Sequence, residues 1–180
     1  MTTLCKNYKK LFLVFLFANA ISFCHAQADP EFPKGFIMYG KLHTGLVTNF
    51  SSSPDLFAGG IQLAPQFTLV PHALRLGVIA GGFYSNKKLQ GEFGPSVSIK
   101  LKTFNAKLQG ATVGTVGNLN VLIDHLWGTD QQRLLGGGLI VDIGVITLGV
   151  TTHRDYNLNT WWFQSEVGIR LSKKHKNTVI

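Results

Sequence analysis

The segment Phe57-Ala-Gly-Gly-Ile-Gln-Leu-Ala-Pro-Gln-Phe-Thr-Leu69 decides the fold, because its large apolar residues recur at every second position. Successive side chains of a β-strand point to opposite faces, so this period of two predicts a strand with one apolar and one polar face. The polar face of residues 58–68 contains only small residues, glutamine and threonine. A strand face exposed to water usually carries charged residues. The uncharged face therefore fits a narrow interior better than a wet surface.

Two further segments show the same alternation. One apolar face contains Phe93, Pro95, Val97, Ile99 and Leu101, and the intervening positions are Glu92, Gly94, Ser96, Ser98, Lys100 and Lys102. Near the end of the chain, Trp161, Phe163, Val167, Ile169 and Leu171 share a face that only Ser165 interrupts. Three clean alternating strands favour an all-β fold over a helical one.

Turn-forming residues separate the strands and set their number. We expect eight strands, at residues 36–48, 56–69, 74–83, 91–102, 116–127, 134–141, 145–153 and 160–171. Long loops at 49–55, 84–90, 128–133 and 154–159 then fall at one end, and short turns at 70–72 and 142–144 fall at the other end with both termini. Residues 104–115 are open to three interpretations: a long turn, the start of strand five or a short helix. The predicted fold is an antiparallel up-and-down β-barrel of eight strands.

The N-terminus has the features of a secretory signal peptide. The basic residues Lys6, Lys9 and Lys10 precede an apolar run at 11–17, and Ala26-Gln27-Ala28 is a small-x-small cleavage pattern. The run is shorter than the roughly 20 apolar residues of a membrane-spanning helix. An uncleaved anchor and a lipoprotein acylated at Cys24 are the alternatives. We expect a cleaved signal over 1–28, a short lead over 29–34, the barrel over 35–171 and a basic tail over 172–180.

Composition narrows the function classes. Charged residues make up 14% of the chain against about 25% in a typical soluble domain. The net charge is +8, but there is no basic stripe with interleaved aromatics, so we expect no nucleic-acid partner. Both cysteines, Cys5 and Cys24, lie within the predicted signal. The mature chain would therefore have no disulfide and no thiol chemistry.

Alternation alone does not say whether the apolar face points into the barrel or out of it. Aromatic residues near the strand ends favour the outward direction, because membrane barrels carry aromatic girdles at both lipid–water interfaces. They are Phe36, Phe50, Phe57, Tyr84, Trp127, Trp161 and Trp162. The uncharged polar face of residues 58–68 supports the same direction.

The last alternating segment is similar to the C-terminal assembly signal of outer-membrane barrels, although Leu171 replaces the usual terminal aromatic and a tail follows it. Residues 35–171 resemble the small eight-stranded outer-membrane barrels typified by OmpX and the OmpA transmembrane domain. The resemblance implies a bacterial outer-membrane location, lipid around the wall and insertion by the barrel assembly machinery. A periplasmic or secreted location is the alternative.

The polar faces predict a network of charges in the lumen. In this register Arg75, Glu92, Lys100, Lys102, Glu166 and Arg170 point inward, and Lys41 and His43 join them if strand one continues the pattern. Eight strands leave an interior just wide enough for side chains to fill. We therefore expect ion pairs that plug the barrel.

The densest polar cluster is His153-Arg154-Asp155, at the end of the seventh strand. Its ordinary interpretation is a hydrogen-bond network at a loop base, while a histidine beside an aspartate also suggests acid–base chemistry. The His-x-Ser-Asn pattern of lipid A deacylases is absent at His43, His125 and His153. No metal motif or phosphate loop appears, so we expect no metal, no cofactor and no catalytic residue.

The resulting functional hypothesis is a non-enzymatic outer-membrane barrel with a structural, adhesive or binding role exercised through its loops. Two alternatives remain open. One is an outer-membrane enzyme that modifies lipids, and the other is a secreted soluble barrel that binds a small hydrophobic ligand.

Overall fold

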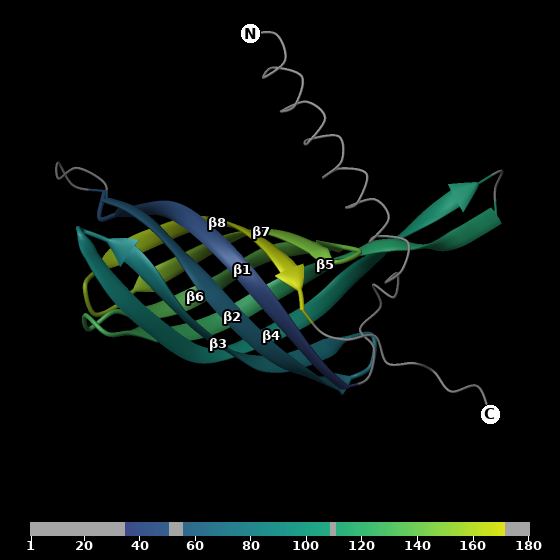
Figure 1. Cartoon of the computed structure of the whole chain (residues 1–180), viewed down its shortest axis with the longest axis horizontal. Helices are drawn as coiled ribbons and strands as arrows, with labels where there is room; N and C mark the ends of the chain where they lie inside the picture. The colour runs from purple at the N-terminus through teal and green to yellow at the C-terminus, as the bar shows by residue number, and fades with distance from the viewer. Residues whose placement is uncertain (1–34, 51–55, 109–110, 172–180) are drawn as a thin grey trace, which may run out of the picture.

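A computed structural model describes residues 35–50, 56–108 and 111–171. They form a closed antiparallel barrel in which each strand pairs with the next and β1 pairs with β8 (Figure 1). The strands are β1 Gly35–Thr48, β2 Leu56–Val70, β3 Leu74–Ser85, β4 Lys88–Leu108, β5 Ala111–Gly128, β6 Arg133–Ile143, β7 Ile146–Asp155 and β8 Thr160–Arg170. The predicted eight-stranded up-and-down barrel is confirmed. The predicted signal, lead and tail lie outside the described residues.

The alternation of β2 sorts its residues as the sequence predicts. Gln62 and Gln66 point into the barrel and are 4% and 6% exposed, whereas Ile61 and Phe67 point outward and are 61% and 55% exposed. In the β1–β2 register Ile61 lies opposite Leu42, and Gln62 lies opposite Lys41. Apolar side chains thus neighbour each other on the outer wall, and polar ones meet inside.

The connections between β1 and β2, β3 and β4, β5 and β6, and β7 and β8 share one end of the barrel, called the loop end below. The predicted long loop at 84–90 is wrong. β3 continues to Ser85 and β4 begins at Lys88, which leaves a two-residue turn. Asn86 and Lys87 have φ values of 50° and 59°. Two positive φ angles in succession match the type I′ turn, whose twist suits a tight hairpin.

Polar side chains close the loop end. Gln132 donates a hydrogen bond to Gln90, and both side chains are buried. The backbone N–H of Gly91 donates to the Thr129 hydroxyl, which ties the β5–β6 loop to β4. Asp155 Oδ1 accepts hydrogen bonds from the backbone N–H groups of Asn157 and Leu158 at 3.0 Å each. These bonds fix the short loops on top of the barrel.

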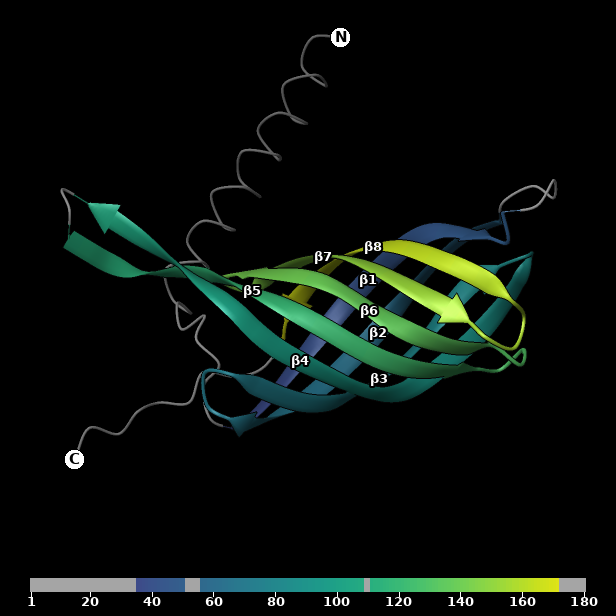
Figure 2. The same ribbon diagram turned by 180° about the vertical axis from the view of Figure 1, so that it is seen from behind.

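The opposite end carries a two-stranded extension. β4 pairs with β3 only as far as Ile99, and β5 pairs with β6 only from Gly117 onward. Beyond those points β4 and β5 pair only with each other, as the ribbon that projects from the barrel in Figures 1 and 2. Of the three interpretations left open for 104–115, the start of strand five is observed for residues 111–115, whereas residues 104–108 continue β4, which none of the three had foreseen. Below, this extension is called the β4–β5 ribbon.

Glycines let neighbouring strands approach closely in β6. A Cβ added at Gly136 or Gly138 would lie 2.1 Å from the Thr152 carbonyl oxygen or 1.9 Å from the Val150 carbonyl oxygen. The predicted short turn at 142–144 also shifts. β6 continues to Ile143, and the turn follows at Gly144, whose φ is +59°. Asp142 is therefore a strand residue that faces the lumen.

The aromatic residues divide unequally between the two faces. Phe36, Phe50 and Phe57 are 60%, 70% and 67% exposed on the outer side, as expected of a girdle. Trp162 does not belong to it. It is 3% exposed and packs edge-on against Phe83 inside the barrel, with 5.3 Å between ring centroids. In the described part of the chain no helix is long and apolar enough to cross a membrane.

Candidate functional site

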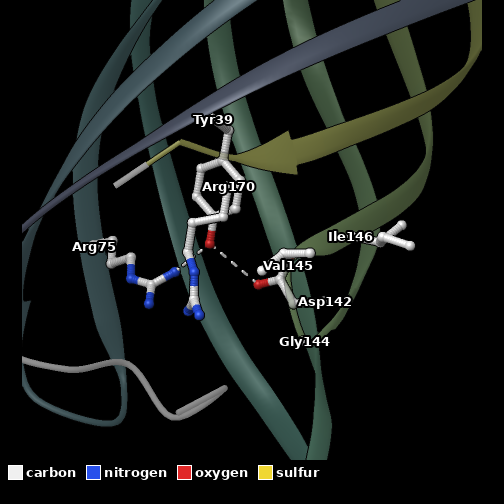
Figure 3. Close-up of a pocket in the computed structure, with 7 residues that line it drawn as sticks. All are labelled: Tyr39, Arg75, Asp142, Gly144, Val145, Ile146 and Arg170. Carbon is white, nitrogen blue, oxygen red and sulfur yellow. Dashed lines mark hydrogen bonds between the residues drawn. The ribbon is translucent and has the colours of Figure 1, made fainter. Parts of the chain in front are cut away.

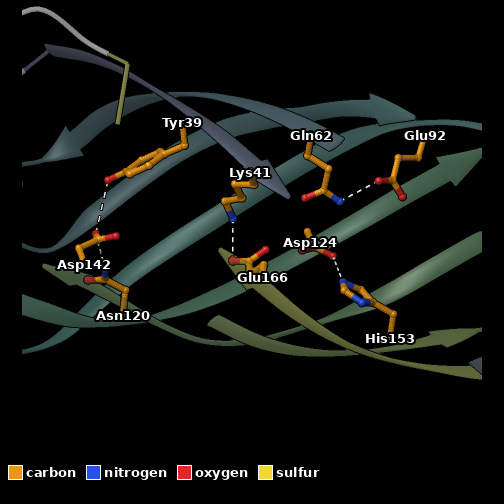
Figure 4. Close-up of polar contacts among 9 residues, drawn as sticks. All are labelled: Tyr39, Lys41, Gln62, Glu92, Asn120, Asp124, Asp142, His153 and Glu166. Atoms are coloured by element: carbon orange, nitrogen blue, oxygen red, sulfur yellow. Dashed lines mark hydrogen bonds and ion pairs between the residues drawn. The ribbon is translucent and has the colours of Figure 1, made fainter. Parts of the chain in front are cut away.

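The candidate functional site is the polar network of the lumen. Buried polar and charged side chains outnumber buried apolar ones among the described residues, and every strand contributes to them. The alternation places them inside, because the apolar residue of each pair occupies the outer wall. Four groups of contacts make up the network, and Figure 4 shows the ion pairs and hydrogen bonds at their centres.

The first group lies towards the end of the barrel that bears the β4–β5 ribbon. Arg75 of β3 donates a hydrogen bond of 2.8 Å to the Tyr39 hydroxyl, which in turn donates one of 3.4 Å to Asp142. Asn120 Nδ2 donates to the same carboxylate oxygen at 2.8 Å. Tyr39, Arg75 and Asp142 line a small recess, and Arg170 of β8 lines it as well (Figure 3). Two guanidinium groups thus lie near a single carboxylate.

The second group is a buried ion pair between the first and last strands. Lys41 Nζ lies 2.9 Å from Glu166 Oε1, and the two side chains are 4% and 5% exposed (Figure 4). Lys41 lies opposite Gly168, two residues beyond Glu166 on β8. A pair this close and this buried joins β1 to β8 through their side chains as well as their backbones. Breaking it would leave a charge without a partner in a dry environment.

The third group centres on Glu92 of β4. Gln62 donates a hydrogen bond of 2.7 Å to Glu92 Oε1, and His43 Nε2 lies 3.6 Å from the same carboxylate oxygen. The other ring nitrogen of His43 lies 3.1 Å from the Gln164 amide nitrogen. These contacts connect β8, β1, β2 and β4 across the lumen.

The fourth group pairs His153 of β7 with Asp124 of β5 at 2.6 Å, and each side chain is 2% exposed. His153 Nδ1 has no hydrogen-bond partner within the described residues, so no relay to a hydroxyl nucleophile is formed there. The rest of the predicted cluster is dispersed. Arg154 lies over the Trp161 ring on the outer wall, and Asp155 points inward beneath the β7–β8 loop.

The predicted lumen residues occupy different surroundings. Glu166 pairs with Lys41 rather than with Arg170, its neighbour four residues along the strand. Arg75 and Glu92 are buried in two separate groups. Lys100 is only half-buried, one position beyond the last β4 residue that pairs with β3. The inward direction predicted for Lys102 is wrong, because the register shift after Lys100 places it opposite the outward-facing Leu119, where it is exposed. The structure therefore brings the other five predicted residues into one lumen but not into one site.

Three ionisable partners in the network were missed at the sequence level: Tyr39, Asp124 and Asp142. A signal was present for two of them. Tyr39 stands two residues before Lys41, and Asp124 shares the even positions of its strand with Asn118 and Asn120. Asp142 was assigned to a turn, so its side chain had no predicted direction.

The lumen is packed rather than hollow. The cavity bounded by Lys41, Gln66, Asn120 and Asp142 measures about 10 Å³. A single water molecule needs roughly that much space. A small hydrophobic ligand does not fit there, and the polar walls would not favour one. The arrangement can hold charges in place and bind the strands together.

Within the ranges that the structure describes, no group of three or more His, Cys, Asp or Glu side chains is placed to hold a metal ion. Comparison of the chain with protein-family models gave no match, and comparison with curated proteins gave none either. The inferences that follow therefore depend on the geometry of this barrel.

Proposed function

We propose that this chain is a bacterial outer-membrane β-barrel with a non-enzymatic structural, adhesive or binding role at its loop end. The observation that carries the proposal is the inverted polarity of the barrel. Charged and amide side chains fill the lumen, while Leu42, Ile61, Val150 and many other large apolar side chains remain exposed on the outside. Exposed apolar area of this extent is rare on monomeric soluble proteins. Lipid is the solvent that such a wall suits.

The strand lengths support this assignment. β6, β7 and β8 contain 11, 10 and 11 residues. A tilted strand needs about 9–11 residues to cross a bilayer. Closure also leaves no open strand edge in the barrel itself, and only closed barrels and helices satisfy their backbone groups in lipid. The outer-membrane lipid would surround the wall, and the barrel assembly machinery would insert it.

The two alternative functions receive less support. A soluble barrel that binds a hydrophobic ligand needs an apolar cavity, and the lumen here is polar and filled. A lipid-modifying enzyme needs a reactive group that reaches the lipid, whereas His153 and Asp124 are buried in the lumen. No specific observation favours either alternative.

Membrane fractionation of the tagged full chain tests the proposal. We expect the protein in the outer-membrane fraction, with the migration on gels depending on heating, as it does for folded membrane barrels. Leu63→Arg is the informative variant, because Leu63 lies at the middle of β2 on the outer wall. Leu89→Arg, at the loop end, is the matched control. A monomer that remains dispersed in detergent-free buffer would overturn the proposal.

Single-channel recording tests the filled lumen separately. We expect the reconstituted barrel to show no large stable pore, because the Lys41–Glu166 pair and its neighbours occupy the interior. A porin-sized current would contradict the packed arrangement. It would leave the membrane location standing and remove the argument that function resides at the loop end.

A further inference from the structure

The outer wall of the barrel carries one cluster of basic side chains at its loop end. There His125 of β5, Arg133 of β6 and Arg154 of β7 occupy outward-facing positions, while Lys102 is exposed near the other end of the wall, opposite Leu119. Their strand neighbours Asp124, Leu134 and Asp155 point inward and are 4%, 1% and 0% exposed, which fixes the outward direction of His125, Arg133 and Arg154. No acidic side chain occupies an outward position of the same described wall. The three residues are called the basic triad below.

The strand register brings the basic triad together. Leu135 lies opposite His125 on one side and opposite Arg154 on the other. Because neighbouring strands lie about 4.8 Å apart, the backbones of His125 and Arg154 are about 10 Å from each other. Arg133 stands two residues from Leu135 on the same face of β6, opposite Trp127. Arg133 is long enough to reach an anion above Leu135, and Arg154, whose guanidinium lies over Trp161 of β8, reaches the same anion by turning back across β7.

Contacts with aromatic residues orient two members of the triad, His125 and Arg154. His125 Nε2 lies 2.9 Å from the Tyr156 hydroxyl, and its ring lies 4.8 Å from the Trp127 ring, centroid to centroid. The Arg154 guanidinium lies 5.1 Å from the centre of the Trp161 ring and also donates to Asn159. Stacking and hydrogen bonding hold both side chains near the wall. Tryptophan and tyrosine mark the level of the lipid headgroups in membrane barrels.

An apolar surface continues directly from the triad along the wall. Leu135, Leu139 and Val150 are 54%, 48% and 60% exposed on β6 and β7. A positive cluster at headgroup level suits the anionic headgroup of a lipid, and the apolar surface below it suits the acyl chains. A free phosphate ion would use only the positive cluster.

We propose that the basic triad binds the phosphate of an anionic membrane lipid, in the leaflet that surrounds the loop end, with the acyl chains against Leu135, Leu139 and Val150. This inference rests on the proposed membrane location. Arginine provides planar, bidentate donors for phosphate oxygens. The site would thus select lipids by headgroup charge at one position on the barrel circumference.

Quenching of tryptophan fluorescence tests the site. The protein in dodecyl maltoside micelles is titrated with phosphatidylglycerol that has brominated acyl chains, because bromine quenches Trp127 and Trp161 only in close contact. Phosphatidylcholine with the same chains and inorganic phosphate serve as competing probes. A basic residue near an anionic headgroup contributes roughly fivefold to affinity. Arg133→Gln with Arg154→Gln should therefore weaken phosphatidylglycerol binding roughly 25-fold.

The matched control is Lys87→Gln with Lys88→Gln, which removes the same charge from the exposed β3–β4 turn at the same end. We expect native binding of phosphatidylglycerol in this variant. Equal affinity of the two lipids, unchanged binding in the arginine variant, or displacement of the lipid by inorganic phosphate would overturn the inference. Insertion into pure phosphatidylcholine vesicles is measured alongside. A barrel that inserts there without headgroup preference contradicts only the lipid site, whereas failure to insert contradicts the proposed function.

Discussion

Lys41→Met should be among the most damaging single substitutions in this barrel. Lys41 and Glu166 are 4% and 5% exposed and lie 2.9 Å apart, so the change leaves a buried carboxylate without its cation. Removal of one partner from a buried ion pair costs about 3–5 kcal/mol. A domain of ordinary size is stable by only about 5–15 kcal/mol. We therefore expect the variant to lose a large fraction of its stability.

The second half of the prediction is that replacement of both partners restores stability. Lys41 lines a small cavity together with the inward-facing side chains of Leu122 and Ile140. Methionine is flexible and fills irregular spaces in such surroundings. Replacement of a buried ion pair by apolar residues is often neutral or stabilising by about 1–4 kcal/mol. Lys41→Met with Glu166→Met should accordingly be more stable than Lys41→Met alone, by about 3 kcal/mol or more.

Urea unfolding in micelles measures both effects, with tryptophan fluorescence and heat-dependent gel migration as the two readouts. Lys88→Met removes an exposed lysine at the start of β4 and is the control, with an expected change within about 0.5 kcal/mol. The reasoning is refuted if Lys41→Met costs less than about 1 kcal/mol, or if the double variant is no more stable than the single one.

Three other predictions concern the wall and the ribbon. Leu63→Arg, at mid-height on the outer wall, should destabilise the inserted barrel by about 2–4 kcal/mol, and Leu89→Arg by about 0–1 kcal/mol, in urea titrations of vesicle-inserted protein. Gly138→Ala should cost about 1–3 kcal/mol, because its Cβ would meet a carbonyl oxygen at 1.9 Å; Gly82→Ala, with 3.4 Å to its nearest atom, should be near neutral in the same titration. Replacement of residues 103–115 by a two-residue turn should leave the barrel folded and its gel migration still dependent on heating; loss of that behaviour would show that the ribbon supports the barrel.

The fold was largely predictable because alternation reports directly on inside and outside. Ile61 and Gln62 are adjacent in sequence and lie on opposite sides of the wall, as the period of two requires. The β4–β5 ribbon was harder to assign. Its strands do not separate a lumen from an outer surface, so polar and apolar residues need not alternate over residues 104–115. The register shifts near Lys100 and Phe104 disturb the period of two further.

The partners within the lumen were less predictable than its inward-facing residues. His153 and Asp155 share a face, but residues two apart on a strand are separated by about 6.8 Å. Asp124 reaches His153 from β5, with only β6 between them. Sequence patterns indicate on which face of the wall a side chain lies. Its position along the barrel axis depends on the stagger between strands, which the patterns do not report. The pairing of Glu166 with Lys41 depends on that position.

Under the proposed membrane location, the β4–β5 ribbon also determines which end of the barrel we expect to enter the bilayer first. From Leu101 to Leu108, over about 24 Å at about 3.4 Å for each residue, its β4 strand has β5 as its one neighbour. Its two edges have no neighbouring strand, and its hydrogen-bonded Thr115 and Asn105 side chains are polar. Unpaired backbone groups cost several kcal/mol each in hydrocarbon. The described turns of the loop end, at 86–87, 129–132 and 156–159, are short. We therefore expect that end to lead during insertion and the ribbon to remain on the side of entry.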